Sequence, residues 1–142
     1  MDEKPKVKLT VTTKVKASKE KVWECWTEPV HIKKWNQASD DWHTPSAEND
    51  LSVGGRFLYR MEAKDGSGGF DFTGYYDEIE PYKRIAYTLD DSRPVEVIFK
   101  ELQDAIEIIE TFEAEDTFAL DYQQQGWQAI LEQFKKYTET IF

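Results

Sequence analysis

The segment "DYQQQGWQAILEQFKKYTET", residues 121–140, repeats its apolar residues at helical spacing. Those residues are Trp127, Ile130, Leu131, Phe134 and Tyr137, with Ile141 just beyond them. Intervals of three and four residues predict one long amphipathic helix from about Asp121 to Thr140. Gly126 costs this helix up to ~1 kcal/mol relative to alanine, so we expect close packing against a neighbouring element at that point. The apolar helix face has to be buried, and the rest of the chain must supply the surface that covers it.

The segments before this helix alternate apolar and polar residues with a period of two, which is typical of half-buried strands. The predicted strands are 6–16, 56–62, 70–81, 84–89, 95–100 and 105–112. Turn sequences such as "KDGSGG" at 64–69 and "DDSR" at 90–93 separate several of them. Such short connections favour antiparallel neighbours.

Two short helices are predicted after the first strand. Ser18 offers an N-cap, Glu20 lies in the first turn, and Pro29 begins a second helix that runs to about Trp35. The element order is then a strand, two short helices, a meander of about six strands and one long helix. A curved antiparallel sheet wrapped around the last helix satisfies this order best, which makes the fold α+β and residues 1–142 one domain.

Composition limits the classes of partner. The chain has 142 residues, a net charge of -10 and a pI of about 4.7, which disfavours nucleic acid and anionic membrane surfaces. Neither a signal peptide nor an apolar run of the ~18 residues that span a membrane is recognisable, so we expect a cytoplasmic protein without membrane insertion. Aromatic residues make up 14% of the chain, and rings in that number can line a cavity as well as fill a core.

Four ordered motifs carry a resemblance to a known family: "KVWECWTEPVHIKKW" at 21–35, "GGRF" at 54–57, "GYYDEIEPYKRIAYT" at 74–88 and "GWQAILEQFKKY" at 126–137. Together they resemble the homologues of the C-terminal domain of the heat-shock-protein-90 ATPase activator, within the START-like (SRPBCC), birch-pollen-allergen superfamily. The resemblance implies a helix-grip fold, in which a seven-stranded antiparallel sheet surrounds the C-terminal helix. It also implies a cavity between sheet and helix, which in many relatives takes lipids, sterols, polyketides or similar molecules.

The resemblance, together with the alternation, suggests which residues form the cavity wall. The candidate ligand-binding residues are Trp35, Trp42, His43, Phe57, Tyr59, Met61, Phe70, Phe72, Tyr76, Tyr87, Phe99 and Trp127. The alternative is that these rings simply fill the core. We expect a small hydrophobic or amphipathic ligand, without a cofactor or a metal.

An alternative hypothesis is that the protein is an enzyme of the cyclase, hydrolase or dehydratase type. Two residues are then candidates for acid/base chemistry. His43 lies in "WNQASDDWHTP", residues 35–45, and a neutral imidazole can act as acid or base. Glu110 lies in "AIEIIETF", residues 105–112, where a shift of one residue in register decides between cavity and solvent. If Glu110 faces inward, desolvation raises its pKa.

A third hypothesis is that the protein is an interaction module and an accessory to the chaperone. Its acidic surface would then bind a basic partner. The chain is too short for the separate N-terminal domain of the eukaryotic activator, which weighs against chaperone contact. The sequence leaves monomer and homodimer open.

Overall fold

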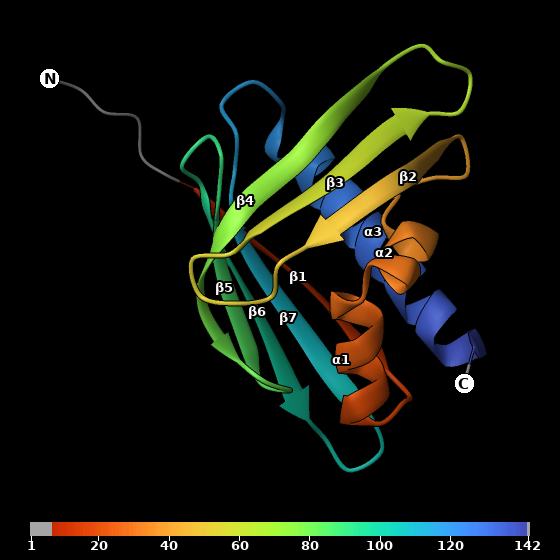
Figure 1. The fold of residues 1–142 in the computed structure, drawn as a ribbon, viewed down its shortest axis with the longest axis vertical. Helices are drawn as coiled ribbons and strands as arrows, with labels where there is room; N and C mark the ends of the chain where they lie inside the picture. Colours follow the sequence, from red (N-terminus) through yellow and green to blue (C-terminus); the bar gives the residue numbers. More distant parts are fainter. Residues whose placement is uncertain (1–6, 142) are drawn as a thin grey trace, which may run out of the picture.

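The computed structural model describes residues 7–141 and shows an α+β fold of seven strands and three helices in this range (Figure 1). The elements are β1 (Lys8–Val15), α1 (Lys19–Thr27), α2 (Pro29–Trp35), β2 (Trp42–Asn49), β3 (Arg56–Ala63), β4 (Gly69–Glu80), β5 (Arg84–Leu89), β6 (Pro94–Glu101), β7 (Ile106–Glu113) and α3 (Leu120–Ile141). The predicted start of the first strand at Lys6 lies outside the described residues.

The seven strands form one antiparallel sheet in the order β1-β7-β6-β5-β4-β3-β2. The sheet curls so that β4, β3 and β2 turn over towards α3, which lies along its concave face (Figure 1). This arrangement confirms the predicted helix-grip fold.

The helix caps follow from the sequence. The Ser18 side chain accepts a hydrogen bond from the Lys21 backbone N–H and so caps α1, and Pro29 occupies the first turn of α2. Gly74 allows the close approach of β4 to β5, because a Cβ atom there would lie 2.3 Å from the Thr88 carbonyl oxygen.

The β2 strand is the one that alternation does not reveal. It lies at one edge of the sheet, and its pairing with β3 shifts register between His43 and Ser46. Pro45 lies within that shift, where the absence of a backbone N–H costs no regular ladder bond. The irregularity breaks the period of two that identifies the other strands.

Side chains of α3 cover the opposite edge of the sheet, strand β1. Gln124 Nε2 donates to the Thr10 carbonyl at 3.2 Å, and Gln128 Nε2 donates to the Thr12 carbonyl at 3.0 Å. The Lys135 ammonium donates to the Lys14 carbonyl, which is the next carbonyl on the same side of β1. These bonds satisfy acceptors that an edge strand would otherwise expose, and they help to fix α3 against the sheet.

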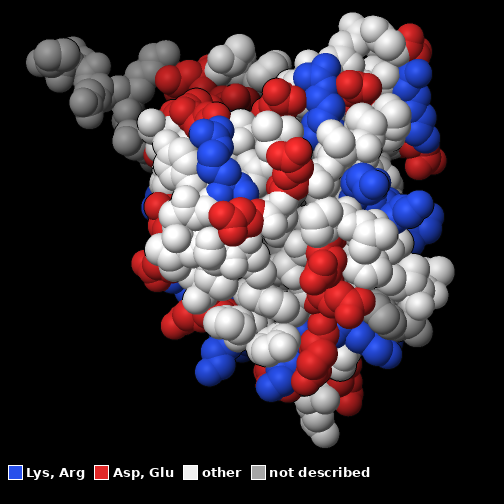
Figure 2. Space-filling model, viewed as in Figure 1, with Lys and Arg blue, Asp and Glu red and all other residues white. Residues whose placement is uncertain are grey.

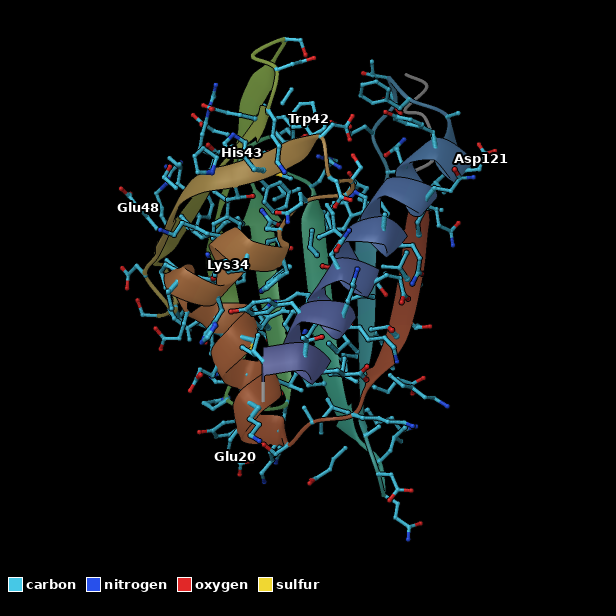
Figure 3. The ribbon with its side chains drawn as sticks, turned by 90° about the vertical axis from the view of Figure 1, so that its right-hand side faces the viewer. Glu20, Lys34, Trp42, His43, Glu48 and Asp121 are labelled. Carbon is cyan, nitrogen blue, oxygen red and sulfur yellow. The ribbon has the colours of Figure 1, made fainter. Side chains whose placement is uncertain are left out.

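The C-terminal half of α3 packs tightly against α1 and α2. Phe134 is 0% exposed, and its ring centroid lies 4.9 Å from that of Trp26 on α1 and 4.9 Å from that of Trp35 on α2. Figure 3 shows both short helices beside this half of α3, with Asp121 at the far end of the helix. We call this region, around Phe134, the packed half of the grip.

Candidate functional site

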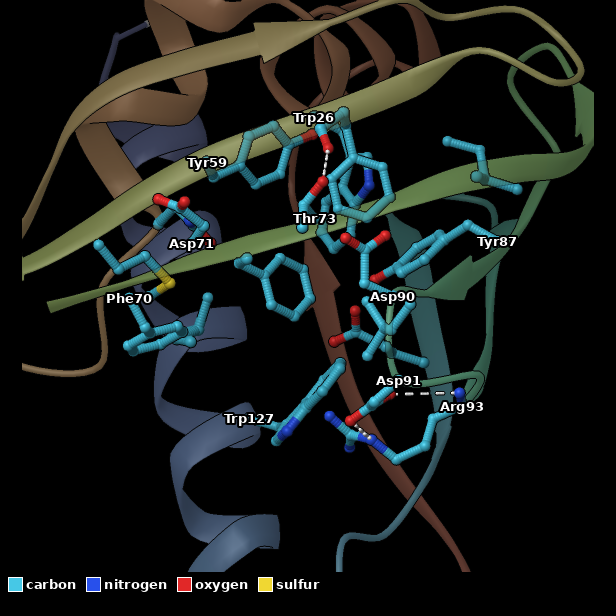
Figure 4. A pocket seen from close by; sticks show the side chains of 18 of the residues that line it. Trp26, Tyr59, Phe70, Asp71, Thr73, Tyr87, Asp90, Asp91, Arg93 and Trp127 are labelled. Atoms are coloured by element: carbon cyan, nitrogen blue, oxygen red, sulfur yellow. Dashed lines mark hydrogen bonds and ion pairs between the residues drawn. The ribbon is translucent and has the colours of Figure 1, made fainter.

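A cavity of about 400 Å³ lies between the N-terminal half of α3 and the inner face of the sheet (Figure 4). We call this region, around Trp127 and Ile130, the hollow half of the grip. Its lining residues are Trp26, Trp35, Asn36, Phe57, Tyr59, Met61, Phe70, Asp71, Phe72, Thr73, Tyr76, Ile85, Tyr87, Leu89, Asp90, Asp91, Arg93, Glu110, Glu115, Trp127, Ile130 and Leu131. The volume falls within the range of small-molecule sites, roughly 300–1,000 Å³.

Most of the predicted ligand-binding residues line this cavity: Trp35, Phe57, Tyr59, Met61, Phe70, Phe72, Tyr76, Tyr87 and Trp127. The rings also pack against one another. Trp127 stacks on Phe112 at 3.9 Å between centroids and meets the edge of Phe72 at 6.0 Å. Their role in binding a ligand stays a prediction.

Three of the predicted residues lie outside the cavity lining. Phe99 is buried in the packed half against Trp23 and Trp26. Trp42 and His43 lie at the start of β2, outside the lining (Figure 3). The His43 side chain is 43% exposed.

The structure resolves the register of β7. Glu110 faces inward and is only 6% exposed. On the sheet, Val11 of β1 and Val97 of β6 lie opposite it, and Ile108 and Phe112 are its inward neighbours along β7. All four are fully buried apolar residues, so the carboxyl lies in an apolar wall of the cavity.

This environment perturbs the ionisation of Glu110. Desolvation raises the pKa of the carboxyl from 4.5 to about 8, because burial penalises the charged form. Within residues 7–141, the Glu110 carboxyl has no hydrogen-bond or ion-pair partner. The pKa of the neighbouring Tyr87 is raised well above its usual range by burial and then by the Glu110 charge. A buried carboxyl without a partner next to a cavity is a candidate for ligand binding or proton transfer.

Tyrosine hydroxyls add polar groups on the opposite wall. The Tyr76 hydroxyl donates to Asn49 Oδ1, and Asn49 Nδ2 donates to the Thr27 carbonyl at 2.7 Å. Burial raises the pKa of Tyr76 to about 12, and that of Tyr59 is raised well above its usual range by burial and the proximity of Tyr76. Both tyrosines are therefore neutral hydrogen-bonding groups at ordinary pH.

The rim of the cavity is charged, and its carboxylates are paired. Arg93 Nε lies 2.7 Å from Asp91 Oδ2, and Arg93 Nη2 lies 3.4 Å from Glu115 Oε1 (Figure 4). Two further pairs are Arg56 with Asp90 at 3.0 Å and Arg60 with Asp71 at 3.3 Å. Because Asp71, Asp90 and Asp91 are exposed, the cavity opens to solvent on this side.

Sequence reasoning did not identify these rim residues. "DDSR" at 90–93 reads only as a turn, and Glu115 follows the last strand without a pattern of its own. Gly126 corrects a different expectation, because a Cβ atom there would meet no atom within 4 Å. The glycine is therefore not required by close packing.

Across residues 7–141, no three His, Cys, Asp or Glu side chains form a group that could hold a metal ion. The helices of this range include none that is long and apolar enough to cross a bilayer.

Comparison with known proteins identifies the family of this chain. Residues 16–139 match the family described as "Activator of Hsp90 ATPase homolog 1-like protein". None of the proteins with curated descriptions matches the chain.

Solved structures agree with this match. An AHSA1-like protein from Aeromonas hydrophila is 44% identical, with a TM-score of 0.88, over 94% of this chain and 92% of that one. A Cytophaga hutchinsonii protein is 50% identical, with a TM-score of 0.79, over 94% of this chain and 92% of that one. A Chromobacterium violaceum protein, 22% identical over 94% of this chain and 98% of that one, shares the fold with a TM-score of 0.84. The chain therefore belongs to the family of proteins like the activator of Hsp90 ATPase homolog 1, as its sequence motifs predict.

Proposed function

We propose that the protein binds a small, largely apolar molecule in the hollow half of the grip. The observation that carries this proposal is the cavity of about 400 Å³, walled by aromatic side chains from β3, β4, β5 and α3. Protein interiors are normally close-packed, with few voids larger than a water molecule. A space of this size at one end of a packed core is an expected feature of a binding site.

The distribution of polar groups supports the same proposal. Tyr59, Tyr87 and Glu110 line the cavity among apolar side chains, and polar groups in such positions orient a ligand. A core filled only for stability would rarely leave a buried carboxyl such as that of Glu110 without a partner. The resemblance to START-like proteins that take hydrophobic molecules points in the same direction.

Fluorescence titration with Nile red, a neutral apolar dye, tests the proposal. We expect saturable binding to the purified protein with a blue shift in dye emission. Trp127→Ala should weaken binding about fivefold, because an aromatic wall contact contributes on the order of 1 kcal/mol.

Tyr122→Ala is the matched control. Tyr122 is an aromatic residue on the same helix, 67% exposed, and it does not line the cavity. The Tyr122→Ala variant should bind the dye with the affinity of the wild type. Equal affinities for all three proteins, or no saturable binding at all, would contradict the proposal.

One observation favours a second candidate function, an enzyme of the cyclase, hydrolase or dehydratase type. Glu110 has a pKa raised to about 8, which suits a carboxyl that donates and accepts protons near neutral pH. In this proposal Glu110 is the acid/base and the Tyr87 hydroxyl orients the substrate, whereas His43 lies outside the cavity lining. Glu110→Gln should then abolish turnover of any substrate found while retaining its binding, and unchanged turnover would contradict the role.

A further inference from the structure

Resting on the proposed function, we infer a chemical class of ligand: the cavity selects hydrophobic amines. The protonated amino group binds at the Glu110 carboxylate, and the apolar body packs between the aromatic walls. Glu110 is the one buried acidic residue of the cavity lining, and it has no hydrogen-bond or ion-pair partner within residues 7–141.

Among the cavity-lining residues, the one cation near Glu110 is Arg93, and it is paired with other carboxylates. The groups that face it or line the same cavity are Tyr59 of β3, Asp71 and Tyr76 of β4, Tyr87 of β5, Asp90, Asp91 and Arg93 of the β5–β6 turn, and Glu115 after β7. The lining residues from α3 are all uncharged, as are the β1 and β6 residues opposite Glu110. A cationic ligand would therefore supply the missing partner.

Arg93 is the only cationic residue in the lining, and it is already engaged. It is ion-paired with Asp91 and Glu115, and its Nη1 donates to the Glu113 carbonyl at 3.1 Å. Because its donors are engaged by these groups, the Arg93 guanidinium has few left to bind an anionic ligand.

The balance of charge also favours a cation over an anion. The lining residues include five acidic residues, Asp71, Asp90, Asp91, Glu110 and Glu115, against the single Arg93. Arg56 and Arg60 offset two of these carboxylates at the rim. The whole chain carries a net charge of -10, so approach of a cation is favoured and approach of an anion is opposed. In Figure 2, acidic and basic side chains are interspersed on the visible face, without a continuous basic area.

The aromatic walls suit the same ligand. The faces of tryptophan and tyrosine rings attract ammonium groups, with a gain of about 0.5–2 kcal/mol that grows as water is excluded. Tyr59, Tyr87 and Trp127 provide such rings in the lining. The cavity therefore offers both a counter-ion and π-faces to a protonated amine.

Binding of an amine should release a proton. In the empty protein burial raises the pKa of Glu110 to about 8, so the carboxyl carries a proton at neutral pH. An ion pair requires the ionised form, so amine affinity should increase towards pH 8 by up to about tenfold per pH unit. A neutral ligand would show no such dependence on this group.

Three probes with one ring system test the inference: naphthylmethylamine, naphthylmethanol and naphthoate. Isothermal titration calorimetry at about pH 8, close to the pKa of Glu110, should show the amine bound about ten- to a hundredfold more tightly than the alcohol. The acid should bind most weakly. At pH 7, titrations in two buffers of different ionisation enthalpy should reveal proton release with the amine only.

Glu110→Gln should remove the preference for the amine, so that the amine and the alcohol bind this variant with similar affinity. Glu107→Gln, on the same strand and the opposite face of the sheet, is the matched control and should behave as the wild type. Equal binding of amine and alcohol, or amine binding unaffected by Glu110→Gln, would overturn the inference while leaving the proposed function standing. Failure of all three probes to bind any variant would count against the proposed function itself.

Discussion

The packed half and the hollow half of the grip are built from the same helix and the same sheet. In the packed half, Trp26 of α1 and Trp35 of α2 close around Phe134. In the hollow half, the rings that Trp127 contacts come from strands, Phe72 of β4 and Phe112 of β7. There β3 and β4 face α3 across the cavity (Figures 1 and 4). The contrast shows that the two short helices determine which part of the sheet–helix space is filled. The cavity is the part that they border only at one end, through Trp26 and Trp35.

The largest expected effect is a difference between the two halves in how much stability is lost when an aromatic side chain is replaced by alanine. Phe134→Ala should lower the free energy of unfolding by about 3–5 kcal/mol, because Phe134 is fully buried among close neighbours. Phe72→Ala should cost only about 1–2 kcal/mol, since the Phe72 ring already borders empty space. Urea denaturation measures both. Equal losses would contradict the division into a packed and a hollow half.

A smaller effect concerns the pH dependence of stability in the hollow half. The pKa of Glu110 is raised from 4.5 to about 8 in the folded protein, so the folded state holds a proton that the unfolded state releases. Stability should therefore fall as pH rises between these two values, by up to about 1.4 kcal/mol per pH unit. Glu110→Gln removes this decline and should stabilise the protein by about 2–3 kcal/mol at pH 7.

Thermal denaturation from pH 5 to pH 9 measures this difference. The wild type and the Glu110→Gln variant should have similar stability near pH 5 and diverge as pH rises. Parallel profiles over the whole range would show that Glu110 is not desolvated in the folded state.

The smallest expected effect is at Gly126, on the part of α3 that belongs to the hollow half. Gly126→Ala should stabilise the protein by about 0.5–1 kcal/mol, because alanine favours the helix and its methyl group meets open space. Gly74→Ala is the control and should destabilise, since its Cβ would collide with the Thr88 carbonyl oxygen. Destabilisation by Gly126→Ala would mean that the space beside it is filled.

Elements with a clear period could be predicted from the sequence. The apolar spacing placed the last helix at residues 121–140, and the structure has it at Leu120–Ile141. Alternation likewise located the other strands, because each buries one face. The exception is β2, where Pro45 and the register shift remove the period. The predicted element order included about six strands after the two short helices, but the pattern did not locate this one.

The candidate site was predictable to the extent that it lies on regular strands. Alternation, together with the family resemblance, placed Tyr59 and Phe72 on inward-facing positions, and both line the cavity. The same reasoning could not orient Glu110, because β7 carries isoleucines on both faces. Arg93 and the rim carboxylates come from turns, which have no period, and only the folded chain brings them to the cavity.

The most direct test of the account is to locate a bound ligand within the grip. Intermolecular nuclear Overhauser effects from naphthylmethanol to the protein methyl groups report which half it occupies. We predict contacts to the cavity-lining Leu89, Ile130 and Leu131, without contacts to Val22 and Ile32 of the packed half. Contacts confined to exposed methyl groups such as those of Val53, or to the packed half, would contradict the claim that the hollow half is a binding site.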